Sequence, residues 1–258
     1  MTAPTCEPRL LAFDTSTDLM SVGVRRGERF WLYSGPGAAQ SSGTLIPTVL
    51  DLLAQAGLSL QQLDAIAFGR GPGSFTGLRT ACAVAQGLAA GSDRLVLPID
   101  TLMAVAEQAR AEAMADEPGG TSPTHITALL DARMDEVYLQ HFEWTNGRWQ
   151  ALGPCQLCAP EAVHLNPGAR VLVAGNAWEV YRERLPELPA GSRSVAALPT
   201  AAALLRLAPG LLHEAVPAAQ ALPLYVRDKV AQTTEERLAS KLAKAEAAEL
   251  AARRSPAP

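Results

Sequence analysis

Near its start, the chain alternates short apolar segments with polar turns, a pattern that predicts β-strands. Residues 10–13 are an apolar run that ends at Asp14, and residues 21–25 alternate apolar and polar side chains. Residues 28–34 continue with aromatic side chains after the turn at Arg26-Gly27. Strands separated by such short turns pair with their neighbours. We therefore expect three consecutive antiparallel strands.

The next segments follow a helical period. Apolar residues recur at intervals of three and four positions, and Gly57 is suited to end that helix. The positions that mark it are Leu45, Val49, Leu52, Leu53 and Ala56. A short apolar strand over residues 65–68 then enters a glycine-rich loop. A second helix is expected after the loop, with Ser74 as its N-cap and Gly91 as its C-cap.

The same order of elements returns in the second half of the chain. Residues 125–144 read as strand, turn and strand, and Asn146-Gly147 is a typical hairpin turn. A duplicated βββαβα lobe is the plan of the two-lobed actin-like and sugar-kinase-like ATPases, which have a ribonuclease H-like α/β fold. We expect an N-terminal lobe over residues 1–102 and a C-terminal lobe over residues 103–232, whose final segment could pack back on the first lobe. Residues 233–258 are expected to form a charged helical tail.

The composition is that of a globular protein, and it argues against nucleic acid or a membrane as a direct partner. The chain has 258 residues, of which 48% are hydrophobic, and a net charge of −4. Because no stripe of lysine and arginine is evident, we do not expect the chain to hold nucleic acid by itself. The N-terminal stretch lacks the features of a signal peptide, and no apolar run reaches the roughly 18 residues of a membrane span. We expect a cytoplasmic protein.

The glycine-rich loop, GRGPGSFTGLR at residues 69–79, matches no phosphate-binding template. Gly77 is followed by Leu78 and Arg79 where a Walker A loop needs Lys and Ser or Thr. The third glycine is one residue late for a dinucleotide-binding fingerprint. Gly71 and Gly73 are expected to hold positive φ in a tight turn. The small residues after them form one helix face, which internal packing and a partner interface explain equally well.

Polar residues at the ends of the predicted strands are the other candidates for chemistry. A carboxylate and hydroxyls at Asp14, Ser16 and Thr17 could hold a Mg²⁺-phosphate group, although such residues more often satisfy turn amides. The second hairpin carries charged residues that are more often solvated than catalytic. They are Asp131, Arg133, Asp135 and Glu136. Gly175-Asn176 could approach an adenine or form an ordinary turn.

Cysteine and histidine give little support for a metal site. Cys155 and Cys158 form one CxxC pair, but a zinc site needs four ligands and no second pair follows. The four histidines form no HxxxH or HxxH pattern. We therefore expect no metal, no cofactor and no catalytic residue.

Several motifs together resemble one family. They are LLAFDTSTDLMSVGV, GRGPGSFTGLRTACAVAQGLA, LLDARMDEVYL, VAGNAW and LPLYVRDKVAQT. The chain resembles the TsaB (YeaZ) family of the bacterial complex that forms N6-threonylcarbamoyladenosine next to the anticodon of ANN-decoding tRNAs. The resemblance runs from about residue 10 to residue 233.

The resemblance implies a non-catalytic subunit that binds the paralogue TsaD, with TsaE joining the pair. It implies pairing with a second copy when TsaD is absent, and contact with tRNA only through the complex. It places the first-lobe helices at the interface. The residues it implicates are Thr44, Leu45, Thr48, Leu52, Thr76, Gly77, Arg79, Thr80 and Ala83.

Two enzyme hypotheses remain beside the subunit. One is an ATP-dependent small-molecule kinase or ATPase of the same fold, which would use Asp14 on the metal-bound phosphate. The second hairpin opposes it, because Asp131-Ala132-Arg133 lacks the glycine of a second phosphate loop. The other is a zinc glycopeptidase, for which the sequence lacks the ligands.

Overall fold

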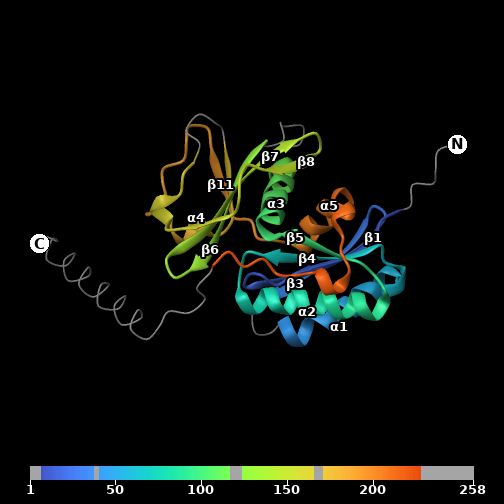
Figure 1. Cartoon of the computed structure of the whole chain (residues 1–258). Coiled ribbons are helices and arrows are strands. Elements are labelled where there is room, and N and C mark those ends of the chain that lie inside the picture. The colour runs from blue at the N-terminus through green and yellow to red at the C-terminus, as the bar shows by residue number, and fades with distance from the viewer. Residues whose placement is uncertain (1–6, 38–40, 117–123, 166–170, 228–258) are drawn as a thin grey trace, which may run out of the picture. The chain divides into compact units, whose positions relative to one another are not determined.

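Two mixed β-sheets carry the fold of this computed structural model, which describes residues 7–37, 41–116, 124–165 and 171–227 (Figure 1). The strands of the first sheet are β1 (Arg9–Asp14), β2 (Leu19–Arg26), β3 (Arg29–Pro36), β4 (Ala65–Gly71) and β5 (Val96–Asp100). The strands of the second are β6 (His125–Arg133), β7 (Glu136–Thr145), β8 (Arg148–Ala151), β9 (Gln156–Cys158), β10 (Leu172–Ala174) and β11 (Arg193–Val195).

The two sheets share one strand order. The first runs β3-β2-β1-β4-β5, and the second runs β8-β7-β6-β10-β11 with β9 added beside β7. In each sheet the first three strands are antiparallel neighbours, and the two later strands lie parallel to the first. The duplicated two-lobed α/β plan that the hydrophobic pattern predicts is therefore confirmed.

Helices cover both faces of the first sheet. α1 (Ser41–Ala56) and α2 (Phe75–Ser92) lie on one face and α5 (Ala201–Leu211) lies on the other. The remaining helices are α3 (Thr101–Asp116) and α4 (Ala177–Val180). Short 3-10 turns are η2 (Leu60–Gln62), η3 (Pro160–Ala162), η4 (Leu212–Glu214) and η5 (Ala218–Gln220). Successive side chains of β1 point to opposite faces, so Leu11 and Phe13 pack under α1 and α2, whereas Leu10 and Ala12 pack under α5 (Figure 1).

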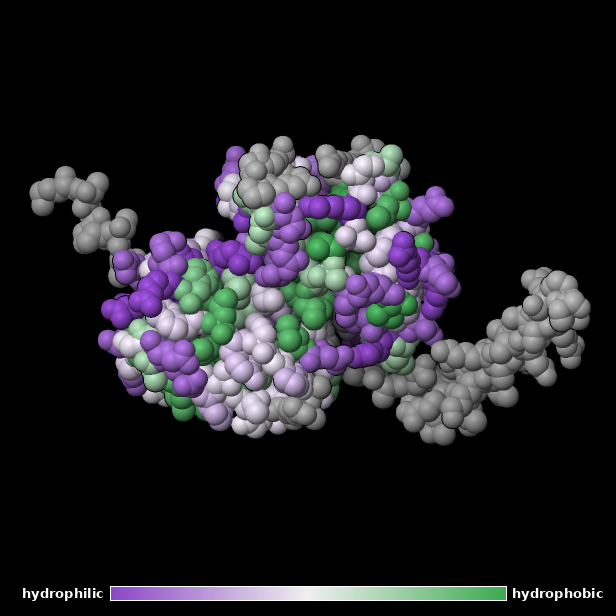
Figure 2. Space-filling model, turned by 180° about the vertical axis from the view of Figure 1, so that it is seen from behind, coloured by the Kyte–Doolittle hydropathy of each residue, from purple (hydrophilic) through white to green (hydrophobic). Residues whose placement is uncertain are grey.

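The second sheet is buried in the same way. Ile126 and Leu130 of β6 share a core with the apolar face of α3, and Leu129 on the opposite face packs with Ala177 of α4. Within the described ranges, no helix combines the length and the apolar character needed to cross a membrane. On the side shown in Figure 2, hydrophobic patches are interrupted by polar side chains.

The last described segment returns to the first sheet. α5 begins there with a hydrogen bond from the Ala201 amide to the Ser21 hydroxyl of β2 (2.8 Å). Further on, the Leu224 amide donates to the Arg70 carbonyl (2.7 Å). The division into lobes at residues 102 and 103 stays a prediction. The predicted charged tail over residues 233–258 lies outside the described residues.

One helix end differs from the prediction. α2 passes Gly91 and ends at Ser92, and Asp93 takes the left-handed conformation after it (φ 54°). The amide of Asp93 donates to the Ala89 carbonyl. The prediction of Gly91 as the cap is wrong, because aspartate adopts this conformation more readily than most residues and can close a helix as glycine does.

Candidate functional site

Asp14 is enclosed at the end of β1. Its carboxylate is fully buried, and the amide and hydroxyl of Ser16 donate to Oδ1 at 2.8 and 2.6 Å. Oδ2 lies against Gly69, where a Cβ would overlap it, and has no hydrogen-bond partner among the described residues. Burial raises the pKa of Asp14 to about 6, and the hydrogen bonds from Ser16 limit the rise. The carboxylate therefore has no open side for a Mg²⁺-phosphate group.

The rest of the first hairpin turn is occupied by local hydrogen bonds. The Thr17 hydroxyl accepts from the Leu19 amide at 3.2 Å. The Ser16 carbonyl accepts from the Ser74 amide at 2.7 Å, which ties the hairpin to the loop before α2. Asp14, Ser16 and Thr17 thus lie together, and their side chains form hydrogen bonds within the turn.

The glycine-rich loop wraps closely around this hairpin. Gly71 has φ +120°, as predicted for a position that needs glycine. Gly73 is different: its φ is not in the positive range, and a Cβ there would lie 2.6 Å from the Ser16 carbonyl oxygen. A Cβ on Gly77 would overlap the Thr15 carbonyl. The prediction of positive φ at Gly73 is wrong. Gly73 and Gly77 instead allow the backbone of the loop and of α2 to lie close to the hairpin.

The nine residues predicted at a partner interface all lie on α1 and α2 but differ in exposure. Those with exposed side chains are Thr44, Thr76, Arg79 and Ala83, and those half-buried are Thr48 and Thr80. The buried ones are Leu45, Leu52 and Gly77. Leu45 and Leu52 belong to the core beneath the helices, so their side chains are closed to a partner. Gly77 makes room for the hairpin within the chain.

Two apolar residues of α1 that the prediction omits are exposed, whereas the two leucines that it names on this helix, Leu45 and Leu52, are buried. Ile46 is 43% exposed and Leu50 is 52% exposed. They lie one helical turn apart, beside the buried stripe of Leu45 and Val49. The sequence carries a signal for them, because the helix has more apolar positions than one buried face can hold. We call Ile46, Leu50, Thr76, Arg79 and Ala83 the α1–α2 face.

Aromatic contacts hold the beginning of α2 to the end of the described chain. The rings of Phe75 and Tyr225 lie 5.2 Å apart, and the Arg79 guanidinium stacks 3.8 Å from the centre of the Phe75 ring. Arg79 Nε also donates to the Tyr225 hydroxyl at 3.2 Å. The sequence pattern could not reveal this contact, since the two segments are far apart along the chain.

The second hairpin repeats the turn geometry of the first. The Arg133 amide donates to Asp131 Oδ1 at 2.8 Å, as the Ser16 amide does to Asp14. Arg133 Nη2 then reaches Asp18 of the first hairpin at 2.8 Å. Within the second lobe Arg184 contacts Asp135 at 3.3 Å, and Glu136 begins β7. The two hairpins therefore face each other through an exposed ion pair.

The remaining candidates have structural contacts. Asn176 Oδ1 accepts from the Asp131 amide at 2.9 Å, and a Cβ on Gly175 would overlap the Leu129 carbonyl. Burial raises the pKa of the Cys155 thiol to about 12 and also raises that of Cys158, which disfavours the thiolates. Among the described residues, no three His, Cys, Asp or Glu side chains gather in an arrangement that could hold a metal ion.

Comparisons with known proteins point to one family. A family model described as TsaD, tRNA N6-adenosine threonylcarbamoyltransferase, matches residues 37–256. The tRNA threonylcarbamoyladenosine biosynthesis protein TsaB of Haemophilus influenzae is 36% identical, over 86% of this chain and 94% of that protein. TsaB of Escherichia coli is 32% identical, over 86% and 96%. The solved structure of YeaZ from Pseudomonas aeruginosa superposes with a TM-score of 0.75 at 38% identity, over 85% of this chain and all of that one.

Proposed function

The chain belongs to the TsaB family of tRNA threonylcarbamoyladenosine biosynthesis proteins, and we propose that it is a non-catalytic subunit that binds TsaD. In this proposal TsaD transfers the threonylcarbamoyl group to the adenosine next to the anticodon of ANN-decoding tRNAs. TsaE joins the pair, and the chain meets tRNA only through the complex. The proposal places the protein in the cytoplasm with its tRNA substrate.

The observation that carries the partner role is the α1–α2 face. Ile46 and Leu50 expose apolar side chains, and Ala83 adds a small exposed residue on the neighbouring helix. Small residues let a second helix approach closely, and exposed apolar ones gain free energy when a partner covers them. We propose that TsaD covers this face in the complex and that a second copy of the chain covers it when TsaD is absent.

Two features favour a role without catalysis. Asp14, the residue that a kinase of this fold would use on metal-bound phosphate, is fully buried against Gly69. The four histidines of the sequence also form no HxxxH or HxxH pair that could bind a catalytic metal ion. These features support a subunit over an ATP-dependent kinase of the same fold.

Reconstitution tests the proposal. TsaD and TsaE from the same organism are incubated with tRNA and the threonylcarbamoyl donor, with and without this chain, and the modified nucleoside is measured by mass spectrometry. We expect modification only when the chain is present, and none from the chain alone. Full modification without the chain, or modification by the chain in the absence of TsaD, would contradict the proposal.

A further inference from the structure

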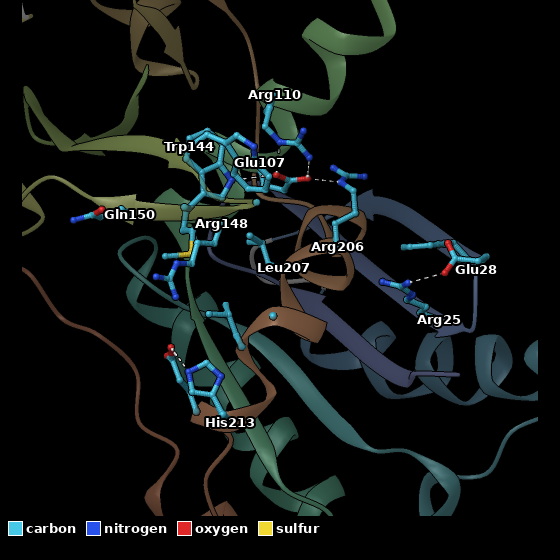
Figure 3. Close-up of a pocket in the computed structure, with 17 residues that line it drawn as sticks. Arg25, Glu28, Glu107, Arg110, Trp144, Arg148, Gln150, Arg206, Leu207 and His213 are labelled. Atoms are coloured by element: carbon cyan, nitrogen blue, oxygen red, sulfur yellow. Dashed lines mark hydrogen bonds and ion pairs between the residues drawn. The ribbon is translucent and has the colours of Figure 1, made fainter. Parts of the chain in front are cut away.

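A pocket of about 810 Å³ opens between α3, α5, the β7–β8 hairpin and the β2–β3 hairpin (Figure 3). It lies apart from the α1–α2 face, and neither the family nor the proposed function assigns it a role. Its volume falls in the range of sites that enclose a small molecule, which is roughly 300–1,000 Å³. Its lining includes four arginines, Arg25, Arg110, Arg148 and Arg206, in a chain whose net charge is −4.

A buried carboxylate holds two of these arginines in place. Glu107 of α3 is 1% exposed and accepts two hydrogen bonds from Arg110, both at 2.9 Å. Arg206 of α5 donates to Glu107 at 2.9 Å and to the Gln108 side chain at 3.0 Å. The Trp149 indole donates the fourth hydrogen bond to Glu107, at 3.1 Å. Both guanidinium groups are therefore fixed before any ligand arrives.

Positive charge remains available in the pocket. The lining has three glutamates against four arginines. Glu107 is a single carboxylate shared by two arginines, Glu28 is already paired with Arg25 at 3.3 Å, and Glu214 lies 3.6 Å from His213. Arg148 is exposed at the start of β8, and its side chain makes no hydrogen bond or ion pair with the residues that the structure describes. Donors of Arg148 and the Nη1 group of Arg206 are thus free to bind an anion.

Aromatic side chains form the wall beside these donors. Trp144 lies against Trp149, with ring centres 5.1 Å apart in an edge-to-face arrangement, and Arg110 stacks on Trp144 at 4.3 Å. Phe30 adds a further ring from β3. Figure 3 shows Trp144 and Arg148 on one side of the pocket and Arg206 on the other, with the Arg206 guanidinium group turned toward Glu107. Arginine beside aromatic rings suits a ligand that joins a phosphate to a planar base.

We propose that this pocket binds a nucleoside phosphate. The phosphate is bound by Arg148 and Arg206, and the base lies against the Trp144 wall. A bare anion would leave most of the volume unfilled. The proposed ligand is a free mononucleotide. One nucleotide of an RNA strand presents the same phosphate and base, so the test includes RNA, and binding of RNA alone would mean that the chain contacts RNA directly and not only through the complex.

Calorimetric titration of the full chain tests the proposal with AMP, ADP, inorganic phosphate and a short single-stranded RNA. Arg148→Ala is the decisive variant, because Arg148 is exposed and the fold makes no use of it. We expect one mole of nucleotide per mole of chain, and about tenfold weaker binding in the variant, the loss of one charge-assisted hydrogen bond. Arg182→Ala, a change at an exposed arginine outside the pocket, should bind as tightly as the unchanged chain.

The arms of the titration separate the two sources of ligand and can overturn the proposal. Binding by AMP or ADP as tight as by the RNA identifies a mononucleotide, whereas binding by the RNA alone identifies a strand. No saturable binding of any nucleotide or RNA up to millimolar concentration would overturn the proposal. Equal affinity for inorganic phosphate would also overturn it. So would a loss of binding in Arg133→Ala but not in Arg148→Ala, because it would place the ligand between the two hairpins.

Discussion

Thr15 and Gly77 lock the first hairpin to the first turn of α2. The Thr15 hydroxyl donates to the Gly77 carbonyl at 2.7 Å, and the backbone of Gly77 lies directly against the Thr15 carbonyl. A side chain at position 77 would meet backbone atoms, which cannot move aside as the end of a flexible side chain can. The glycine that the sequence motif emphasises is thus needed within the chain.

Substitution of this glycine should therefore destabilise the fold. We expect Gly77→Ala to lower the free energy of unfolding by about 3 kcal/mol, since overpacking against backbone forces the helix or hairpin to shift. The matched control is Gly87→Ala on the same helix, where a Cβ meets nothing within 4 Å. That control should gain about 0.5–1 kcal/mol from helix propensity. Urea unfolding of both variants measures the difference, and equal stabilities would refute the packing argument.

Binding to TsaD should depend on the α1–α2 face. Leu50→Glu places a charge on a side chain that is 52% exposed, so folding should be little affected. If a partner covers Leu50, the buried charge should weaken the complex at least about tenfold. Val180→Glu, at a position 55% exposed on α4, is the control. Unchanged affinity of the Leu50→Glu variant, measured by calorimetry, would exclude this face as the interface.

Asp14 should make stability depend on pH. Its pKa is about 6 in the folded chain against an ordinary value of 3.8, so the folded state holds the proton more tightly. Stability from this group is present below about pH 4 and lost as the pH rises through 6, by up to about 3 kcal/mol. Asp14→Asn removes this titration.

The unfolding free energy of Asp14→Asn, relative to the unchanged chain, should therefore rise between pH 4 and pH 7. Any cost of the amide that does not depend on pH changes this difference equally at pH 4 and at pH 7, so the rise between the two pH values is unaffected. Asp51→Asn, at an exposed position on α1, should show no such rise. A flat difference for Asp14→Asn would mean that Asp14 titrates normally in the folded chain.

The Glu107 cluster should contribute strongly to stability. Glu107→Gln keeps the shape but leaves two arginines without their buried counter-charge, and we expect a loss of about 3 kcal/mol. Glu112→Gln on the same helix breaks no ion pair within the described residues and should change stability by less than about 0.5 kcal/mol. Thermal unfolding compares the two, and similar melting temperatures would show that the cluster contributes little.

Local pattern predicted the elements well, because alternation and helical spacing report which face of each element is buried. The strand meander before Gly37 and the hairpin turn at Asn146-Gly147 lie where the pattern placed them. The pattern was less accurate in placing helix ends and in separating exposed from buried residues on a helix. Leu45 and Leu52, which the family resemblance places near an interface, lie in the core of the first sheet. Spacing identifies a helix face but does not say what covers it.

The sequence by itself determined the duplicated α/β plan and the family, since both depend on periodicity and on motifs that are contiguous along the chain. Tertiary structure alone decided what the glycines and charged residues do. Gly77 leaves the space that the Thr15 carbonyl occupies. Glu107 forms ion pairs with Arg110 on its own helix and with Arg206 on α5. These contacts join segments that are distant along the chain, and only the folded backbone brings the groups within hydrogen-bonding distance.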